Sequence, residues 1–252
     1  MRIGLIGAGN MARALARGWG EPVLASDAGS GRAQSLADEL GGEALGSNLE
    51  VARRADLIVL CHKPAQLRPI AEEIASERKP VVSVLAGTGV AALEAAYAGA
   101  AVFRVVPNTP VEVRQGVSLY ASGTSVPAEL EGEVVALFER LGSVLRLPEP
   151  VLDAAAAVSS VGPAYVALLV EAQVDAAIRS GLGAPIAGRL VAETMAGTAT
   201  LLVKRDYDTL AVRREVASPG GTTARGLAAL ERAGVRTAFQ DAMDAVRSWS
   251  TQ

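Results

Sequence analysis

The sequence predicts an α/β protein, with a doubly wound parallel sheet over residues 1–150 and an all-α domain over residues 151–252. Two observations carry this prediction. Strand and helix patterns alternate from the first residues to about residue 147, which is typical of a parallel sheet covered on both faces. No strand pattern returns after Pro148 and Pro150, so these prolines are expected to mark the domain boundary.

The chain opens with a short apolar run, residues 3–6, that breaks into Gly7-x-Gly9-x-x-Ala12 before helical spacing begins. Gly7 permits the tight turn, Gly9 lets the main chain approach a pyrophosphate, and the small Ala12 lets helix and strand pack closely. The helix start offers free N–H groups and the positive end of its dipole to the phosphates. The pattern favours a Rossmann-like dinucleotide site over an α/β turn that binds no nucleotide.

The second strand, residues 22–26, ends at Asp27, about 20 residues after the glycine turn. A carboxylate at this place binds the ribose 2′-hydroxyl of NAD. The following loop nevertheless carries Ser30 and Arg32, a hydroxyl and a guanidinium that could hold the 2′-phosphate of NADP. A solvated side chain is an equally good interpretation of Arg32. The choice between NADH and NADPH stays open on these residues.

A near-continuous apolar run, residues 55–61, is expected to be a central parallel strand, and His62-Lys63-Pro64 follows it over the cofactor crevice. His62 is the single histidine and so a candidate acid–base group, although a histidine beside a cofactor more often packs or hydrogen-bonds. Cys61 is interpreted as unreactive core, and Asn48, at the start of a helix, as an N-cap. Further strands are predicted at residues 80–85, 101–106, 116–121 and 144–147.

The C-terminal part is predicted to be helical throughout, and two helices, residues 163–180 and 185–203, are apolar round most of their circumference. Such helices must be buried on more than one side, and about a hundred residues are too few to enclose them. We therefore expect a homodimer that buries them between two chains.

A second stretch with chemical potential is Ser218-Pro-Gly-Gly-Thr-Thr223, ahead of a helical run at residues 224–232. Consecutive main-chain N–H groups at a glycine-rich helix start form an anion site, which would suit a substrate carboxylate with a threonine hydroxyl nearby. A glycine-containing loop with a threonine cap is the simpler alternative on these residues alone.

Composition narrows the function classes. The net charge of −3 offers no basic patch for nucleic acid, and one cysteine excludes an internal disulfide, which fits a reducing compartment. The N-terminus is already strand rather than a signal peptide, and the longest apolar run, residues 164–170, is far too short to cross a bilayer. We expect a cytoplasmic protein that binds a small molecule, with no metal, nucleic-acid or membrane partner.

Several motifs, in order along nearly the whole chain, resemble the pyrroline-5-carboxylate reductase family. The glycine turn and Lys63-Pro64 are shared with many dehydrogenases, whereas the set Val106-Pro-Asn-Thr-Pro110, Gly162-Pro-Ala-Tyr165 and Ser218-Pro-Gly-Gly-Thr-Thr223 is specific. The resemblance implies hydride transfer from NADPH or NADH to the C=N carbon of 1-pyrroline-5-carboxylate, giving L-proline in the last step of proline biosynthesis. It also implies an interleaved homodimer with the active site at its interface, and in some members a decamer.

The resemblance further implies roles for single residues. Thr223 matches the threonine whose hydroxyl contacts the ring nitrogen and is the candidate catalytic residue. Gly220, Gly221 and Thr222 would bind the substrate carboxylate with it, and Glu149 aligns with an acidic residue near the substrate. The glycine motif and the resemblance together predict a cofactor site of Gly7, Ala8, Gly9, Asn10, Met11, Ser26, Asp27, Asn48, Cys61, His62, Lys63, Pro64, Ala86 and Gly87.

The chain departs from the family at three places. Members usually read Ser-Gly-Ser-Gly-Pro at residues 159–163, so a hydroxyl is missing at Val161. His62 replaces a usual valine. Asp27 and Ala28 replace a loop often richer in Ser, Asn and Arg, which puts the NADPH preference in doubt.

The reaction asks little of acid–base groups, because an iminium carbon is already electrophilic and the cofactor donates the hydride. Thr223 is therefore expected to orient the substrate by a hydrogen bond rather than to act as an indispensable acid. The rivals are a reductase of another imine or a β-hydroxy acid, and a non-catalytic nucleotide-binding dimer. A β-hydroxy-acid enzyme would be expected to place a lysine in the long helix after the boundary, and no lysine occurs in residues 151–203.

Overall fold

The computed structural model describes residues 1–250, with side chains to residue 247, and divides into two compact units, Met1–Pro163 and Ala164–Gln252. The boundary falls later than the prolines at 148 and 150 because helix α7, Glu149–Ser159, packs against strand β7, Gly116–Ser122. The start of the predicted helical domain is thus attached to the sheet by its contacts.

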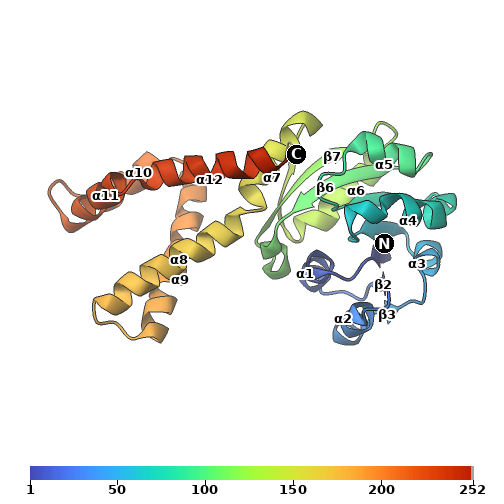
Figure 1. Ribbon diagram of the computed structural model, residues 1–252, viewed down its shortest axis with the longest axis horizontal. Helices are drawn as coiled ribbons and strands as arrows, with labels where there is room; N and C mark the ends of the chain where they lie inside the picture. The colour runs from blue at the N-terminus through green and yellow to red at the C-terminus, as the bar shows by residue number, and fades with distance from the viewer. Residues whose placement is uncertain (251–252) are drawn as a thin grey trace. The chain divides into compact units, whose positions relative to one another are not determined.

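The first unit is one eight-stranded sheet with the order β3-β2-β1-β4-β5-β6-β7-β8 and helices on both faces (Figure 1). The order of its first six strands is that of a doubly wound nucleotide-binding sheet, so the predicted fold class is confirmed. The remaining strands are β1 Ile3–Ile6, β2 Leu24–Ser26, β3 Glu43–Ala44, β4 Leu57–Leu60, β5 Val81–Ser83, β6 Val102–Pro107 and β8 Gly142–Arg146. The helices before α7 are α1 Asn10–Trp19, α2 Arg32–Leu40, α3 Asn48–Arg54, α4 Leu67–Ile74, α5 Val90–Ala96 and α6 Ala128–Glu139, with 3₁₀ turns η1 Pro64–Gln66, η2 Ala75–Glu77 and η3 Thr109–Val113.

The sheet is not parallel throughout, which the sequence did not reveal. β6 and β7 pair antiparallel, with Val105 opposite Tyr120, because only the short turn η3 joins them. A parallel connection needs a crossover of a dozen or more residues. Helix α6 supplies such a crossover between β7 and β8, which are parallel to each other.

Each face of the sheet has its own hydrophobic layer. On one face α1, α2 and α6 pack around Leu5, Trp19 and Phe138, where the two aromatic rings meet edge-on with centroids 5.8 Å apart. On the other face α3, α4, α5 and α7 cover Ile58, Leu93 and Leu152. Because both faces are covered, the free ends of the strands are where the sheet can meet a ligand.

The second unit is helical over its described residues 164–250 (Figure 1). Its helices are α8 Gly162–Arg179, α9 Ala184–Lys204, α10 Thr209–Val216, α11 Thr222–Arg232 and α12 Val235–Ser250. α8 and α9 remain open to solvent along their apolar faces, with Leu168 and Leu190 64% and 51% exposed. Such large exposed apolar faces indicate a surface that another molecule covers.

By length and composition alone, two helical stretches would suffice to cross a membrane, Glu149–Arg179 and Ala184–Lys204. The uninterrupted apolar run of residues 164–170 is too short to cross a bilayer, but small residues extend the apolar character well beyond it. One or two such helices are weak evidence for a membrane, because the core helix of a soluble protein can have the same length and composition.

Candidate active site

A crevice opens at the carboxyl ends of β1, β2 and β4, the edge at which doubly wound sheets bind ligands. Eight of the predicted cofactor residues line it: Gly7, Ala8, Gly9, Asp27, Asn48, Cys61, His62 and Lys63. Ser30 and Arg32, the candidates for a 2′-phosphate, also line it, as does Ala28. Ile6, Gln66 and Ile70 complete the lining and were missed, although Gln66 and Ile70 lie one helical turn apart directly after Pro64.

The two glycines of the turn have different roles. Gly7 has a φ of +96°, and a Cβ there would lie 2.8 Å from the main chain of Cys61 and His62. A Cβ on Gly9 would meet nothing within 4 Å, so the space in front of it is open. No side chain caps α1 at Gly9, which leaves the first N–H groups of the helix, those of Asn10 and Met11 included, for a ligand. The turn therefore fits a pyrophosphate.

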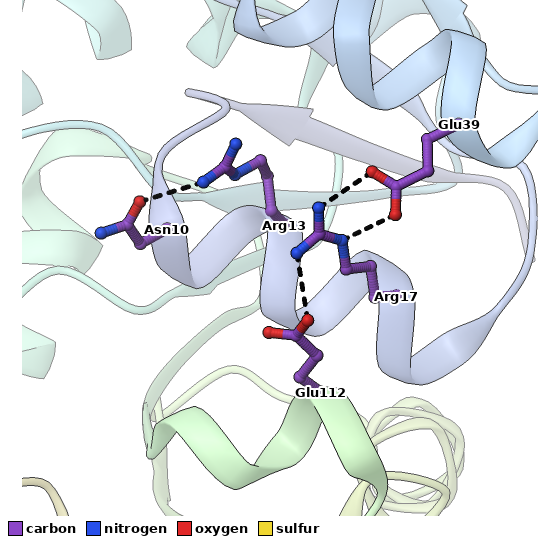
Figure 2. Close-up of polar contacts among 5 residues, drawn as sticks. All are labelled: Asn10, Arg13, Arg17, Glu39 and Glu112. Carbon is purple, nitrogen blue, oxygen red and sulfur yellow. Dashed lines mark hydrogen bonds and ion pairs between the residues drawn. The ribbon is translucent and has the colours of Figure 1, made fainter.

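Figure 2 shows the polar side-chain contacts of α1, two of which hold Arg17 in its last turn. Arg17 pairs with Glu39 of α2 at 2.7 Å and with Glu112 of η3 at 3.0 Å, while Arg13 donates to the Asn10 side-chain oxygen at 3.4 Å. Since two carboxylates hold Arg17, its guanidinium fastens helices rather than binding phosphate. The main-chain N–H groups at the start of α1 remain available to a ligand.

Both oxygens of the Asp27 carboxylate accept hydrogen bonds from the loop that follows it. It accepts hydrogen bonds from the main-chain N–H groups of Gly29, Ser30 and Ala33 at 2.9, 3.1 and 3.0 Å, and from the Ser30 hydroxyl at 2.7 Å. These donors, the Ala33 N–H foremost, lower the pKa of Asp27 below its usual range. An ionised carboxylate has about four acceptor positions, so all of them are used.

Arg32 of the same loop is exposed, and its guanidinium has no ion-pair or hydrogen-bond partner within residues 1–247. Its positive charge therefore remains available at the crevice.

The side chains of Cys61 and His62 are both neutral near pH 7. Burial of the thiol raises the pKa of Cys61 to about 12, so it is neutral near pH 7. Nδ1 of His62 lies 2.9 Å from the Lys63 carbonyl oxygen, which can only accept, so Nδ1 carries the proton. Burial lowers the pKa of His62 while this contact opposes the shift, and the buried Nε2 has no partner in the described chain. A neutral ring whose one N–H is already used is a poor proton donor.

Asn48 is not the N-cap of α3, so that interpretation was wrong. Ser47 is the cap, because its hydroxyl oxygen accepts from the Glu50 N–H at 3.1 Å. Asn48 instead accepts from the Ser26 hydroxyl at 2.8 Å and donates to Glu73 at 2.7 Å. These contacts hold its side chain at the rim of the crevice.

Six predicted cofactor residues do not line the crevice, and three of them, Pro64, Ala86 and Gly87, lie near the same edge. Pro64 opens η1, directly after Lys63. Ala86 and Gly87 follow β5, whose register places Ser83 opposite Leu60 of β4. The loop after β5 therefore runs beside the segment that leads into His62.

Glu149 lies outside this crevice, in a second hollow beside Val90, Thr124 and Arg146. Its Oε1 accepts from the Val90 N–H at 2.6 Å and from Arg104 Nη1 at 3.4 Å. The carboxylate is thus bonded to the first unit itself.

The loop before α11 is built by its glycines. The Gly221 N–H donates to the Ser218 carbonyl at 3.1 Å and Gly220 has a φ of +70°, as in a type II turn with Pro219 at its second position. A Cβ on Gly221 would lie 2.5 Å from the Ser218 hydroxyl. No side chain caps α11, so the first N–H groups of the helix, including those of Thr222 and Thr223, can hold an anion.

Comparisons with known proteins agree on one family. The sequence model described as pyrroline-5-carboxylate reductase dimerisation matches residues 149–252, and the one described as NADP oxidoreductase, coenzyme F420-dependent, matches residues 2–87. The first match covers α8 and α9 and supports a homo-oligomer.

Relatives of known function align along most of the chain. A pyrroline-5-carboxylate reductase of Mycobacterium tuberculosis is 39% identical over 82% of this chain and 79% of its own length. One of Pseudomonas aeruginosa is 36% identical over 100% of this chain and 96% of its own. The crystal structure of the Plasmodium falciparum enzyme with NADP bound is 28% identical, with a TM-score of 0.88 over 99% of this chain and 97% of that one. The chain belongs to the pyrroline-5-carboxylate reductase family.

Proposed function

We propose that this protein reduces 1-pyrroline-5-carboxylate to L-proline, with the reduced nucleotide in the crevice at β1, β2 and β4 and the substrate carboxylate on the loop of residues 220–223. The observation that carries the proposal is the alignment of the whole chain with curated pyrroline-5-carboxylate reductases. The chain is accordingly an NAD(P)H-dependent oxidoreductase.

The bound nucleotide would supply the hydride, and the protein supplies position. The uncapped first turn of α1 holds the pyrophosphate, and the first turn of α11 holds the substrate carboxylate. The Thr223 hydroxyl hydrogen-bonds the ring nitrogen, its oxygen accepting from the N–H of the protonated iminium. Holding two reactants at a near-attack distance is by itself a large contribution to rate, so no side chain need act as an indispensable acid.

NADPH is the proposed preference. Asp27 occupies the place of an NAD-selecting carboxylate, but its acceptor positions are filled by Gly29, Ser30 and Ala33. Arg32 lines the same crevice with its charge unpaired in the described residues, which suits a 2′-phosphate. The Plasmodium falciparum relative was solved with NADP bound.

A dimer formed through α8 and α9 is the proposed working unit, and a decamer would be built from five such dimers. A cytoplasmic location fits the single cysteine, whose thiol is neutral directly after β4.

The test is the oxidation of NADPH and NADH by the purified protein with three substrates. These are 1-pyrroline-5-carboxylate, its six-membered analogue and a β-hydroxy acid, the last assayed in the oxidative direction. Turnover with the five-membered imine supports the proposal. Turnover with only another substrate would assign a different reductase, and tight nucleotide binding without any turnover would indicate a nucleotide-sensing dimer.

A further inference from the structure

We infer that Glu149 is a positioning residue of this reductase: it fixes the loop of residues 86–90 beside the cofactor crevice, and the buried Arg104 holds it there. The inference rests on the proposed function only in assigning that loop to the bound nucleotide. It differs from the role that the family resemblance implies, in which Glu149 lies near the substrate.

The contact between Glu149 and the loop is direct. Glu149 Oε1 accepts from the Val90 N–H at 2.6 Å, across 59 residues of sequence. Val90 is the first residue of α5, so its N–H has no partner within the helix, and a Cβ on the N-cap Gly89 would lie 3.2 Å from the same Oε1. Glu149 therefore satisfies a main-chain donor that the start of α5 leaves free and that an N-cap side chain, which accepts from the second or third helical residue, would not reach.

Arg104 explains why Glu149 stays in place. Its side chain is 5% exposed in the middle of β6, and a buried guanidinium needs carboxylate partners. It pairs with Glu149 at 3.4 Å and with Asp153, one turn further along α7. Both carboxylates thus compensate the charge of Arg104, but only Glu149 also reaches the loop.

The position of the loop connects this cluster to the cofactor. The Val84 N–H donates to the Leu60 carbonyl at 3.1 Å, so the chain leaving β5 runs beside the chain leaving β4, which continues into Cys61, His62 and Lys63 of the crevice. Within the loop, the turn bond from Thr88 N–H to the Leu85 carbonyl is long, at 3.4 Å. The bond from Glu149 is the short one that holds its end.

Three variants separate positioning from the alternatives. Glu149→Ala removes the acceptor for Val90, whereas Glu149→Gln keeps an oxygen that can accept from both Val90 and Arg104 but removes the charge. Asp153→Asn is the matched control, because it weakens the pairing of Arg104 without touching the loop. For each we would measure kcat, the KM of NADPH and of the imine, the Kd of NADPH by fluorescence titration, and Tm.

We expect Glu149→Ala to lower kcat/KM about tenfold, as for loss of one hydrogen bond to a charged group. The loss should come mainly from a lower kcat and from a higher KM and Kd of NADPH. Glu149→Gln should stay within about threefold of the wild type. Asp153→Asn should lower Tm as Glu149→Ala does, yet keep kcat/KM and the NADPH Kd within about twofold.

Three results would overturn the inference. Equal losses in Glu149→Gln and Glu149→Ala, seen in the KM of the imine, would mean that the charge itself meets the substrate. Equal kinetic losses in Asp153→Asn and Glu149→Ala would mean that the cluster around Arg104 has only a general structural role. Unchanged kinetics in Glu149→Ala would mean that Glu149 does not position the loop. A wild type that does not reduce the imine would refute the proposed function instead, and the NADPH Kd would still report on the loop.

Discussion

The main-chain N–H of Ala33 donates to the Asp27 carboxylate at 3.0 Å, which ties the first turn of α2 back to the end of β2. Two more main-chain donors and one hydroxyl fill the rest of this carboxylate. An aspartate in the position typical of an NAD-binding side chain is therefore used to shape a loop, and the same loop presents Arg32 to the crevice.

From this arrangement we predict that the wild type has a higher kcat/KM for NADPH than for NADH. Arg32→Gln should lower kcat/KM for NADPH about tenfold and change NADH little, because one charge-assisted contact to a phosphate is lost. Asp27→Asn removes the charge that organises the loop, so it should weaken the binding of NADPH and of NADH to a similar degree. Arg53→Gln, at an arginine paired with Glu77 away from the crevice, is the control.

Steady-state kinetics with both nucleotides decide this. A wild type that prefers NADH, with a loss in Asp27→Asn confined to NADH, would show that the carboxylate binds the ribose after all.

Local patterns were sufficient for most of the first unit. The apolar run ending at Gly7 and the glycine spacing identified β1, its turn and the crevice, because strand, turn and helix there are specified by neighbouring residues. The strand at residues 116–121 was predicted, but its antiparallel direction was missed, since that direction depends on how η3 joins β7 to β6 rather than on its own residues. The Asp27 and Glu149 contacts were missed for the same reason: partner choice is a property of the fold, not of spacing.

Substitutions at the two glycines of the turn should have opposite effects on nucleotide binding and on stability. Gly9→Val should fold normally, because Gly9 has an ordinary φ of −73° and open space around its Cβ, but it should raise the NADPH KM at least about tenfold by filling the pyrophosphate position. Gly7→Ala should instead lower Tm, because its φ of +96° and the main chain at 2.8 Å leave no room for a Cβ. Thermal unfolding and nucleotide titration separate the two, and a Gly9→Val protein that binds NADPH as the wild type does would exclude this turn as the phosphate site.

His62 predicts a pH dependence of stability. Burial lowers the pKa of His62 in the folded protein, so as the pH falls below the unfolded value of about 6.5 the unfolded chain takes up a proton that the folded chain does not. The folded state therefore loses stability below that pH. His62→Val, which restores the residue usual in the family, should raise Tm, and the gain should grow between about pH 8 and pH 5.5.

Differential scanning calorimetry of both proteins across that range measures the gain. A gain that is constant with pH would show that the imidazole titrates equally in both states. Turnover of the variant should remain within about threefold, because a neutral ring with its proton bonded to Lys63 has none to donate.

A charged side chain placed on the exposed apolar face of α8 should disrupt the oligomer. Leu168 of α8 is 64% exposed in the single chain and belongs to the region matched by the dimerisation family. Leu168→Arg should shift the protein toward monomer and abolish turnover, because an unpaired guanidinium would be buried in the interface. Sedimentation velocity measures this, with Gln34→Arg on the exposed side of α2 as the control. A Leu168→Arg protein that keeps the wild-type mass would place the interface on another face.

Thr223 lies half-buried in the first turn of α11, where its hydroxyl can meet a group held by the helix N–H donors. Thr223→Ala should lower turnover roughly 10- to 100-fold, in line with one hydrogen bond of about 1.5–3 kcal/mol to a charged group. Thr223→Ser keeps the hydroxyl and should recover most of that loss, whereas an essential acid would leave the alanine variant inactive. Single-turnover rates with saturating imine distinguish the two roles, because an orienting bond slows the hydride step without stopping it. A fully inactive Thr223→Ala protein that still forms its dimer would show that the threonine hydroxyl has to deliver a proton.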